Sequence, residues 1–274
     1  MYRKLIRKKF NCPILITVPH AGSFYPELFL KYYKKELNFV RKIEDFKIDK
    51  VLKFLKPESA DIIIAECSRA VVDLNRSRKA IDNSMFDEVY EKGIIHEKIM
   101  LDYGLGVLPK NISNKPFFSN KLPVSYADTM LSNFYDPFHN FLSQHIQQLV
   151  KFSGYCFHID LHSMPSKALY NFKIEPDIVL GDNFGKSCSI ELINHFKSCF
   201  NKNGLIVEKN DPYAGGFITR HYGNPSFNIH SIQIEINRKL YMDEKNLLIN
   251  KNIQKIQKIF SDIFNNFEFN QKLA

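Results

Sequence analysis

The most informative motif of this chain is His158-Ile159-Asp160-Leu161-His162-Ser163-Met164-Pro165. It continues an apolar segment and ends at a proline, which is typical of a buried strand that runs out into a loop. Because side chains alternate along a strand, His158, Asp160 and His162 share one face. Burying two imidazoles and a carboxylate is costly unless something pairs with them. The shared face therefore favours a metal site or a proton relay, whereas a single histidine of this kind is more often a hydrogen-bonded core residue.

Two shorter apolar runs upstream predict further buried strands. Ile14–Val18 is rich in β-branched residues and ends at Pro19-His20-Ala21-Gly22, and Asp61–Ala65 is a second run of the same kind. Open α/β sheets keep their chemistry beyond the carboxyl ends of their strands. His20 is therefore a candidate site residue.

The spacing of apolar residues over 43–55 predicts a helix. Asp45 would then lie in line with the apolar stripe through Ile48 and Leu52. Acids in a first helical turn usually only complement the helix dipole. An acid on the apolar side is less usual, so Asp45 is a candidate metal ligand.

The segment 67–76 has an apolar middle and arginines near both ends, which predicts a strand-like element. A solvated rim is the default for any one arginine. Arg69 and Arg76, at the two flanks, are placed to hold a carboxylate in a bidentate fork.

Residues 231–237 alternate strictly, with isoleucines on one face and Gln233, Glu235 and Asn237 on the other. Two explanations stay open: an edge strand that faces water, or a strand whose polar face lines the active site. Upstream, the turn at 210–216 contains Gly215 and Gly216, which allow a close backbone approach to a ligand. A simple tight turn is the alternative for these glycines.

The remaining pattern alternates strands (177–181, 205–207) with helices (27–37, 186–200), and 85–123 is loop-rich. A helical pattern over 125–151 is interrupted at Asp136-Pro137, and His139 follows in the first turn of the second helix. A long helix from 244 to about 267 closes the chain. We therefore predict an α/β fold, a three-layer sandwich with a central mixed sheet, in one domain over residues 1–274.

Composition limits the class of protein. The chain has 274 residues, of which 45% are hydrophobic, but no apolar run long enough to span a bilayer and no signal-peptide pattern. Its five scattered cysteines predict reduced thiols and a cytoplasmic location. The net charge of +9 comes largely from dispersed lysines, so we predict a small anionic substrate rather than nucleic acid or a membrane as the partner. The oligomeric state is not predicted.

Several motifs occur in a fixed order along nearly the whole chain. They are Val18-Pro19-His20-Ala21-Gly22, Arg69 with 71–76, Asp160-Leu161-His162-Ser163-Met164-Pro165, 178–182, Asn210 with 212–216, 233–238 and 240–242. With these motifs in this order, the chain resembles the N-formylglutamate amidohydrolase family.

The resemblance implies a phosphorylase/hydrolase-like fold related to zinc carboxypeptidases. It implies hydrolysis of N-formyl-L-glutamate to formate and L-glutamate in histidine degradation, with zinc or another divalent metal and no organic cofactor. By this analogy His20 and His162 are metal ligands and Glu235 is the general base. In the carboxypeptidase relatives a glutamate ligand stands three residues after the first histidine, where this chain has Ser23.

We predict Asp45 as the third ligand in place of that glutamate, with Glu44 as the alternative. His139 is kept as a catalytic candidate, although Phe138 stands where the family motif has tyrosine. The predicted substrate-binding residues are Arg69, Arg76, Arg220, Gly215 and Gly216. Two other functions stay open: a related metallo-amidohydrolase for another N-acyl amino acid or short peptide, and a non-catalytic basic binding protein.

Overall fold

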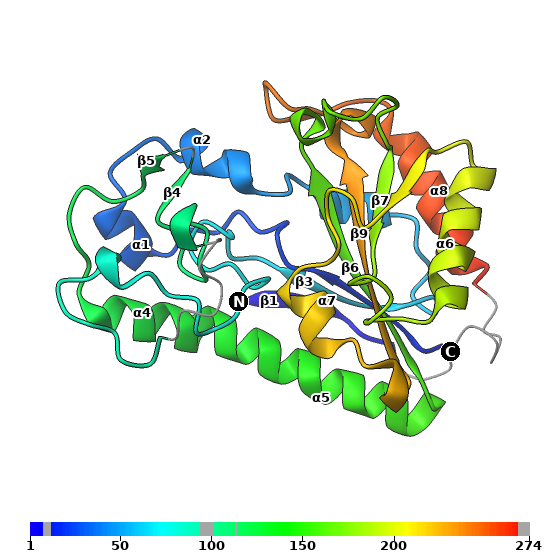
Figure 1. The fold of residues 1–274 in the computed structure, drawn as a ribbon, viewed down its shortest axis with the longest axis horizontal. Helices are drawn as coiled ribbons and strands as arrows, with labels where there is room; N and C mark the ends of the chain where they lie inside the picture. Colours follow the sequence, from blue (N-terminus) through cyan, green and yellow to red (C-terminus); the bar gives the residue numbers. More distant parts are fainter. Residues whose placement is uncertain (8–11, 94–100, 113, 268–274) are drawn as a thin grey trace. The chain divides into compact units, whose positions relative to one another are not determined.

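The computed structural model describes residues 1–7, 12–93, 101–112 and 114–267 (Figure 1). The chain groups into two compact units, each built from separate stretches of sequence. The first unit holds Met1–Arg3, Pro19–Phe46 and Ala65–Leu142, and the second holds Lys4–Val18, Lys47–Ile64 and Ser143–Ala274. The organisation as one domain over 1–274 stays a prediction.

The second unit is organised around a seven-stranded mixed sheet. Four neighbouring pairs are parallel, namely β2 with β3, β2 with β6, β6 with β9, and β7 with β8, whereas β7 runs antiparallel to β9. In spatial order the strands are β1 (Tyr2–Leu5), β3 (Asp61–Ala65), β2 (Ile14–Val18), β6 (Cys156–Met164), β9 (Ile229–Asn237), β7 (Ile178–Gly181) and β8 (Val207–Lys209).

The register gives the sheet one polar and one apolar face. Thr17 lies opposite Asp160 on neighbouring strands, and His162 lies opposite Glu235. Residues in register on adjacent strands point to the same side, so the polar side chains of β2, β6 and β9 gather on one face. Because β9 is an internal strand and Glu235 is buried, the explanation of 231–237 as an edge strand facing water is wrong.

Helices cover both faces of this sheet (Figure 1). On the apolar face, α6 (Ile190–Lys202) packs against α8 (Ile253–Asn265) through aromatic rings, such as Phe200 on Phe260 at 5.5 Å between centroids. On the polar face, α7 (Phe217–Tyr222) places the Tyr222 ring 6.5 Å from that of His158. These layers confirm the predicted α/β sandwich with a central mixed sheet.

The first unit consists of short elements and long loops. Aromatic side chains pack inside it, for example Phe29 stacked on Tyr33 at 5.1 Å. Its elements are α1 (Glu27–Tyr32), α2 (Leu37–Val40), η1 (Arg41–Ile43), η3 (Asn83–Met85), β4 (Asn111–Ile112), β5 (Lys115–Pro116), α4 (Val124–Met130) and the π-helical η4 (Leu131–Tyr135). The loop-rich character predicted for 85–123 holds in the described part of that range. α5 (Asp136–Ser153) begins in the first unit and continues into the second.

The helix predicted over 43–55 is wrong. Beyond Ile43, which ends η1, only Ile48–Leu52 is helical, as a short 3-10 helix (η2), and the residue before it, Lys47, has a left-handed φ of 52°. That backbone conformation breaks the helical period. Asp45 therefore lies in a loop ahead of η2 rather than on a helix face.

Three further elements differ from the expectation. The strand-like segment 67–76 forms turns, with an isolated bridge from Cys67 to Phe24. The helix predicted over 27–37 ends at Tyr32. The last helix begins at Ile253, because a small hairpin of β10 (Met242–Asp243) and β11 (Leu248–Ile249) occupies the preceding residues.

None of the helices in the described ranges combines the length and the apolar character that a membrane span requires.

Candidate metal centre

His162 lies near the carboxyl end of β6 and is held by a buried carboxylate. Its Nε2 is 2.9 Å from Oδ2 of Asp160, and both side chains are buried. Burial opposes ionisation of Asp160, but His162 and Thr17 outweigh it and hold the pKa of that carboxyl below its ordinary value. A carboxylate only accepts hydrogen bonds, so Nε2 of His162 carries a proton, and in the neutral imidazole Nδ1 keeps its lone pair. That is the tautomer in which an imidazole can bind a metal through Nδ1.

Glu235 is positioned beside His162 by the register of β6 and β9. One of its carboxylate oxygens accepts a hydrogen bond of 2.8 Å from the amide of Gln233. The carbonyl oxygen of the same amide accepts a bond of 2.6 Å from the backbone N–H of Gly216. Gln233 thus ties the glycine turn to the predicted general base.

The glycine turn passes very close to the end of β7. Gly215 has a φ of +118°, a conformation that disfavours other residues, and a side chain on Gly181 would meet the backbone nitrogen of Gly215 at 2.6 Å. The turn therefore favours glycine at position 215 and leaves no room for a side chain at position 181.

In the first unit, His20 follows the end of β2 by two residues and lies between two carboxylates. Its Nε2 is 2.7 Å from Oδ1 of Asp73, and its Nδ1 is 3.7 Å from Oδ2 of Asp45. The Nε2 proton is directed to Asp73 by the same argument as for His162. In the neutral imidazole, Nδ1 and the Asp45 oxygen each offer a lone pair, an arrangement that suits a shared cation.

Asp73 is fully buried, which by itself would raise the pKa of its carboxyl. Arg69 and His20 outweigh burial and hold that pKa well below its ordinary value. The guanidinium of Arg69 donates to Oδ2 of Asp73 at 2.6 Å and 3.2 Å. Asp73 is therefore an ionised partner that orients His20.

The two acids considered as third ligand have different surroundings. Glu44 accepts hydrogen bonds from the hydroxyls of Tyr25 and Ser68, the latter at 2.6 Å. Asp45 is held next to His20 by its backbone N–H, which donates to the His20 carbonyl at 3.0 Å. The contacts within this unit therefore favour Asp45.

The remaining predicted side chains, those of Arg76, Arg220 and His139, each contact a backbone carbonyl oxygen. Nε of Arg76 donates to the Leu105 carbonyl at 3.0 Å, and the exposed Arg220 donates to the Gly215 carbonyl at 3.2 Å. Nε2 of His139 is 2.9 Å from the carbonyl oxygen of Leu74, next to Asp73 in sequence. This contact shows His139 supporting the loop that carries Asp73, and its catalytic role stays a prediction.

Two buried residues with roles described above, Asp73 and Thr17, were not predicted as site residues, and Gln233 was named only as part of the polar face of 231–237. Each had a weak signal. Thr17 is the polar residue of an otherwise apolar strand, Gln233 precedes Glu235 on the same face, and Asp73 lies between the two flanking arginines.

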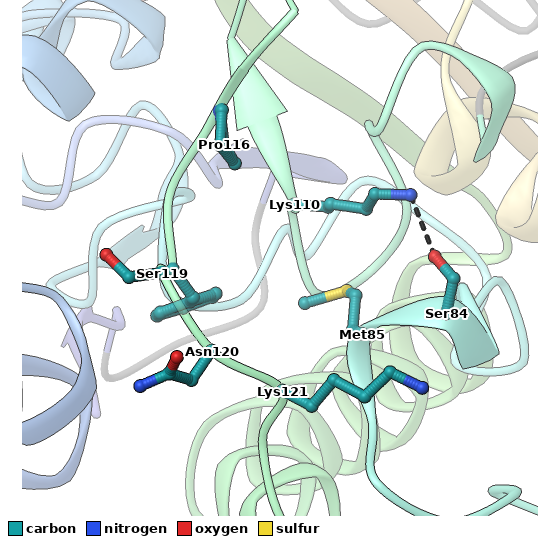
Figure 2. Close-up of a pocket in the computed structure, with 8 residues that line it drawn as sticks. Ser84, Met85, Lys110, Pro116, Ser119, Asn120 and Lys121 are labelled. Carbon is teal, nitrogen blue, oxygen red and sulfur yellow. Dashed lines mark hydrogen bonds between the residues drawn. The ribbon is translucent and has the colours of Figure 1, made fainter.

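A separate pocket of about 200 Å³ lies in the first unit (Figure 2). Nζ of Lys110, which lines it, donates to Asp82 at 2.7 Å and to Ser84 at 2.8 Å. None of the predicted site residues lines this pocket. Its lining residues are Ser84, Met85, Lys110, Pro116, Phe118, Ser119, Asn120 and Lys121.

The donor chemistry of the described residues fits a divalent metal. His20 and Asp45 of the first unit and His162 of the second, the predicted ligands, each offer one ligand atom. Two imidazoles and one carboxylate are a donor set found in catalytic zinc sites.

Comparisons with known proteins agree with the motifs. The family model of N-formylglutamate amidohydrolase matches residues 12–242. The N-formylglutamate deformylase of Pseudomonas aeruginosa is 27% identical over 242 residues, which cover 87% of this chain and 85% of the relative. The enzyme of the same name from Pseudomonas putida is 29% identical over 238 residues, which cover 85% of this chain and 82% of the relative.

Two solved structures share the fold of this chain. The crystal structure of N-formylglutamate amidohydrolase from Ralstonia eutropha JMP134 has a TM-score of 0.88 and 26% identity, covering 96% of this chain and 95% of that one. The crystal structure of a gene product from Agrobacterium tumefaciens has a TM-score of 0.60 and 18% identity, covering 96% of this chain and 95% of that one. At this identity the match supports the fold alone.

These matches define the class of protein as an amidohydrolase, an enzyme that cleaves amide bonds by adding water. The chain belongs to the N-formylglutamate amidohydrolase family, whose model covers most of its length. The family and the class of enzyme predicted from the sequence are confirmed.

Proposed function

We propose that this protein hydrolyses the formamide bond of N-formyl-L-glutamate to formate and L-glutamate, as part of histidine degradation. The observation that carries the proposal is the register of β6 and β9. It pairs a histidine whose tautomer suits a metal, His162, with a buried acid, Glu235, in a chain of this family.

We propose that a metal ion, which we expect to be zinc, is bound by His20, Asp45 and His162. Support comes from the donor group itself and from the chain's connectivity. β2 and β6 are adjacent parallel strands, and the carboxyl ends of parallel strands lie at the same edge of a sheet. His20 is only two residues beyond the end of β2, a reach of about 7 Å.

When bound, a divalent metal would supply a Lewis acid for the formyl oxygen and lower the pKa of the attacking water. Glu235 would take the proton of that water on a carboxylate oxygen and pass it to the leaving nitrogen of glutamate. Gln233 would keep the carboxylate of Glu235 in place through its 2.8 Å hydrogen bond.

Arg69, Arg76 and Arg220 are proposed to bind the carboxylates of the substrate. Planar guanidinium groups match carboxylates in a bidentate geometry, and two carboxylates distinguish glutamate from most other amino acids. Gly215 and Gly216 would shape the pocket through their backbone. His139 stays a catalytic candidate without an assigned step, and the cytoplasmic location stays a prediction.

The test is formate release from a panel of N-formyl-L-glutamate, N-formyl-L-glutamine and N-acetyl-L-glutamate, with acetate measured for the last. We expect formate from N-formyl-L-glutamate, loss of release after chelation and its return with added zinc. Release from another N-acyl amino acid alone would assign a different substrate to the same site. Absence of hydrolysis across the panel with metal bound would overturn the proposal.

A further inference from the structure

A continuous chain of buried hydrogen bonds crosses three strands of the second unit and ends at His162. Oγ of Ser231 is 2.8 Å from Nδ1 of His158, and Nε2 of His158 is 2.8 Å from Oγ1 of Thr17. The Thr17 hydroxyl is 2.7 Å from Oδ1 of Asp160, whose Oδ2 accepts from His162 at 2.9 Å. All five side chains are at most 3% exposed.

The direction of every proton in this chain follows from its end at Asp160. An ionised carboxylate only accepts, so the single hydroxyl proton of Thr17 must point at Asp160. Thr17 can then only accept from His158, which places the proton of that imidazole on Nε2. Nδ1 of His158 is left as an acceptor, and Ser231 donates to it.

The neutral state of His158 agrees with this order. Burial lowers the pKa of this histidine to about 4, so at neutral pH it carries one proton and can be donor and acceptor at once. A doubly protonated imidazole would offer Ser231 a donor instead of an acceptor.

We propose that Thr17, His158 and Ser231 are positioning residues that fix Asp160, and through it the metal-binding tautomer and orientation of His162. This inference deepens the proposed function and rests on it in one respect, namely that His162 is a metal ligand. Hydrogen bonds in a buried chain polarise one another, so loss of one member weakens the rest. Partners of metal-ligating histidines typically contribute about 10- to 100-fold to metal affinity.

The test is zinc affinity, measured by competition with a chromophoric chelator, in a matched pair of variants at one position. Thr17→Val keeps the shape of the side chain and removes the hydroxyl, whereas Thr17→Ser keeps the hydroxyl. We expect about a 10-fold loss of affinity for the valine variant and near-normal affinity for the serine variant. Ser231→Ala, at the far end of the chain, should give a smaller loss of about 3-fold, and it carries the test if Thr17→Val does not fold.

The control is His145→Gln, which perturbs another buried histidine–aspartate pair of the same unit outside the chain. It should leave zinc affinity unchanged even where it lowers stability. Equal affinity for Thr17→Val and Thr17→Ser, or an equal loss in His145→Gln, would overturn the inference while leaving the proposed function intact.

A second readout does not depend on metal. Long-range ¹H–¹⁵N correlation spectra of the metal-free protein report which nitrogen of each histidine carries the proton. We expect the Nε2–H tautomer for His158 and His162 in the wild type. A proton on Nδ1 of either residue would overturn the inference. A wild type that shows the expected tautomers and binds no zinc would instead count against the proposed function.

Discussion

Two buried histidine–aspartate pairs in the second unit have the same local geometry and different surroundings. In each pair a histidine Nε2 lies 2.9 Å from a carboxylate oxygen: His145 with Asp61, and His162 with Asp160. Asp61 also accepts two bonds from the guanidinium of Arg7, at 2.8 Å and 3.1 Å. Within the described residues, no lysine or arginine donates to Asp160, which accepts from the Thr17 hydroxyl instead.

The pairs differ in what balances the charge of the aspartate. This difference suits the His145–Asp61 pair to a structural role and the His162–Asp160 pair to metal binding. Burial opposes the ionisation of Asp61, but His145 and Arg7 outweigh it and lower the pKa of that carboxyl to about 2. Its charge is balanced by a cation built into the chain. At the other pair the proposed metal would supply the positive charge, next to Glu235. Variants at the two pairs and at Glu235 test this contrast.

The largest effect is expected at Glu235, because the acid opposite His162 has the proposed catalytic role. Glu235→Gln should lower kcat for formate release by about 100- to 10,000-fold, because a general base contributes on that order. Zinc content should stay at the wild-type level, as measured by atomic absorption. Near-normal turnover with zinc bound would show that the base is another group.

Asp61→Asn should destabilise the protein by about 3–5 kcal/mol, because it leaves the buried Arg7 charge without its partner. Asp160→Asn should cost less, about 1–3 kcal/mol, since Asp160 accepts from a hydroxyl and an imidazole rather than from a guanidinium. Chemical denaturation of the metal-free proteins measures both. An equal cost for the two variants would remove the contrast between the pairs.

His162→Ala should lower zinc affinity by at least about 100-fold, since even the partners of ligating histidines contribute up to that amount. His145→Ala should keep wild-type affinity. Chelator competition at equal folded concentration compares the two variants. Loss of zinc in His145→Ala, or its retention in His162→Ala, would show that the metal site has been assigned to the wrong histidine–aspartate pair.

The smallest effect concerns acid sensitivity through His158. Its folded pKa of about 4 lies below the unfolded value of about 6.5, so the unfolded state binds more protons between these values. Stability should therefore fall by about 2 kcal/mol from pH 7 to pH 5 through this group. His158→Gln, which has no titrating ring, should flatten that part of the profile for the metal-free protein. An unchanged slope would show that His158 is not buried in the neutral form.

Local sequence patterns predicted the central strands and part of the candidate site, and the predictions that failed have physical causes. The apolar segment ending at Pro165 predicted β6, strict alternation predicted β9, and the period of two predicted the shared face of His158, Asp160 and His162. Thr17 was missed because its partner at Asp160 depends on the register between strands distant in sequence. Such register is not encoded in either segment alone.

Asp45 was selected for a reason that proved wrong. The helical spacing of 43–55 suggested an inward acid, whereas a left-handed Lys47 ends that period and the loop places Asp45 beside His20. Asp73, the partner of His20, was read only as part of an arginine-flanked segment. Turns that bring distant polar groups together leave a weak periodic signal.

A zinc titration of the metal-free protein, with formate release from N-formyl-L-glutamate as the readout, tests whether one bound metal ion supports hydrolysis. We expect the rate to rise linearly and to level off at one equivalent of zinc per chain. Release that is already maximal before zinc is added, or that stays absent at every zinc concentration, would contradict it.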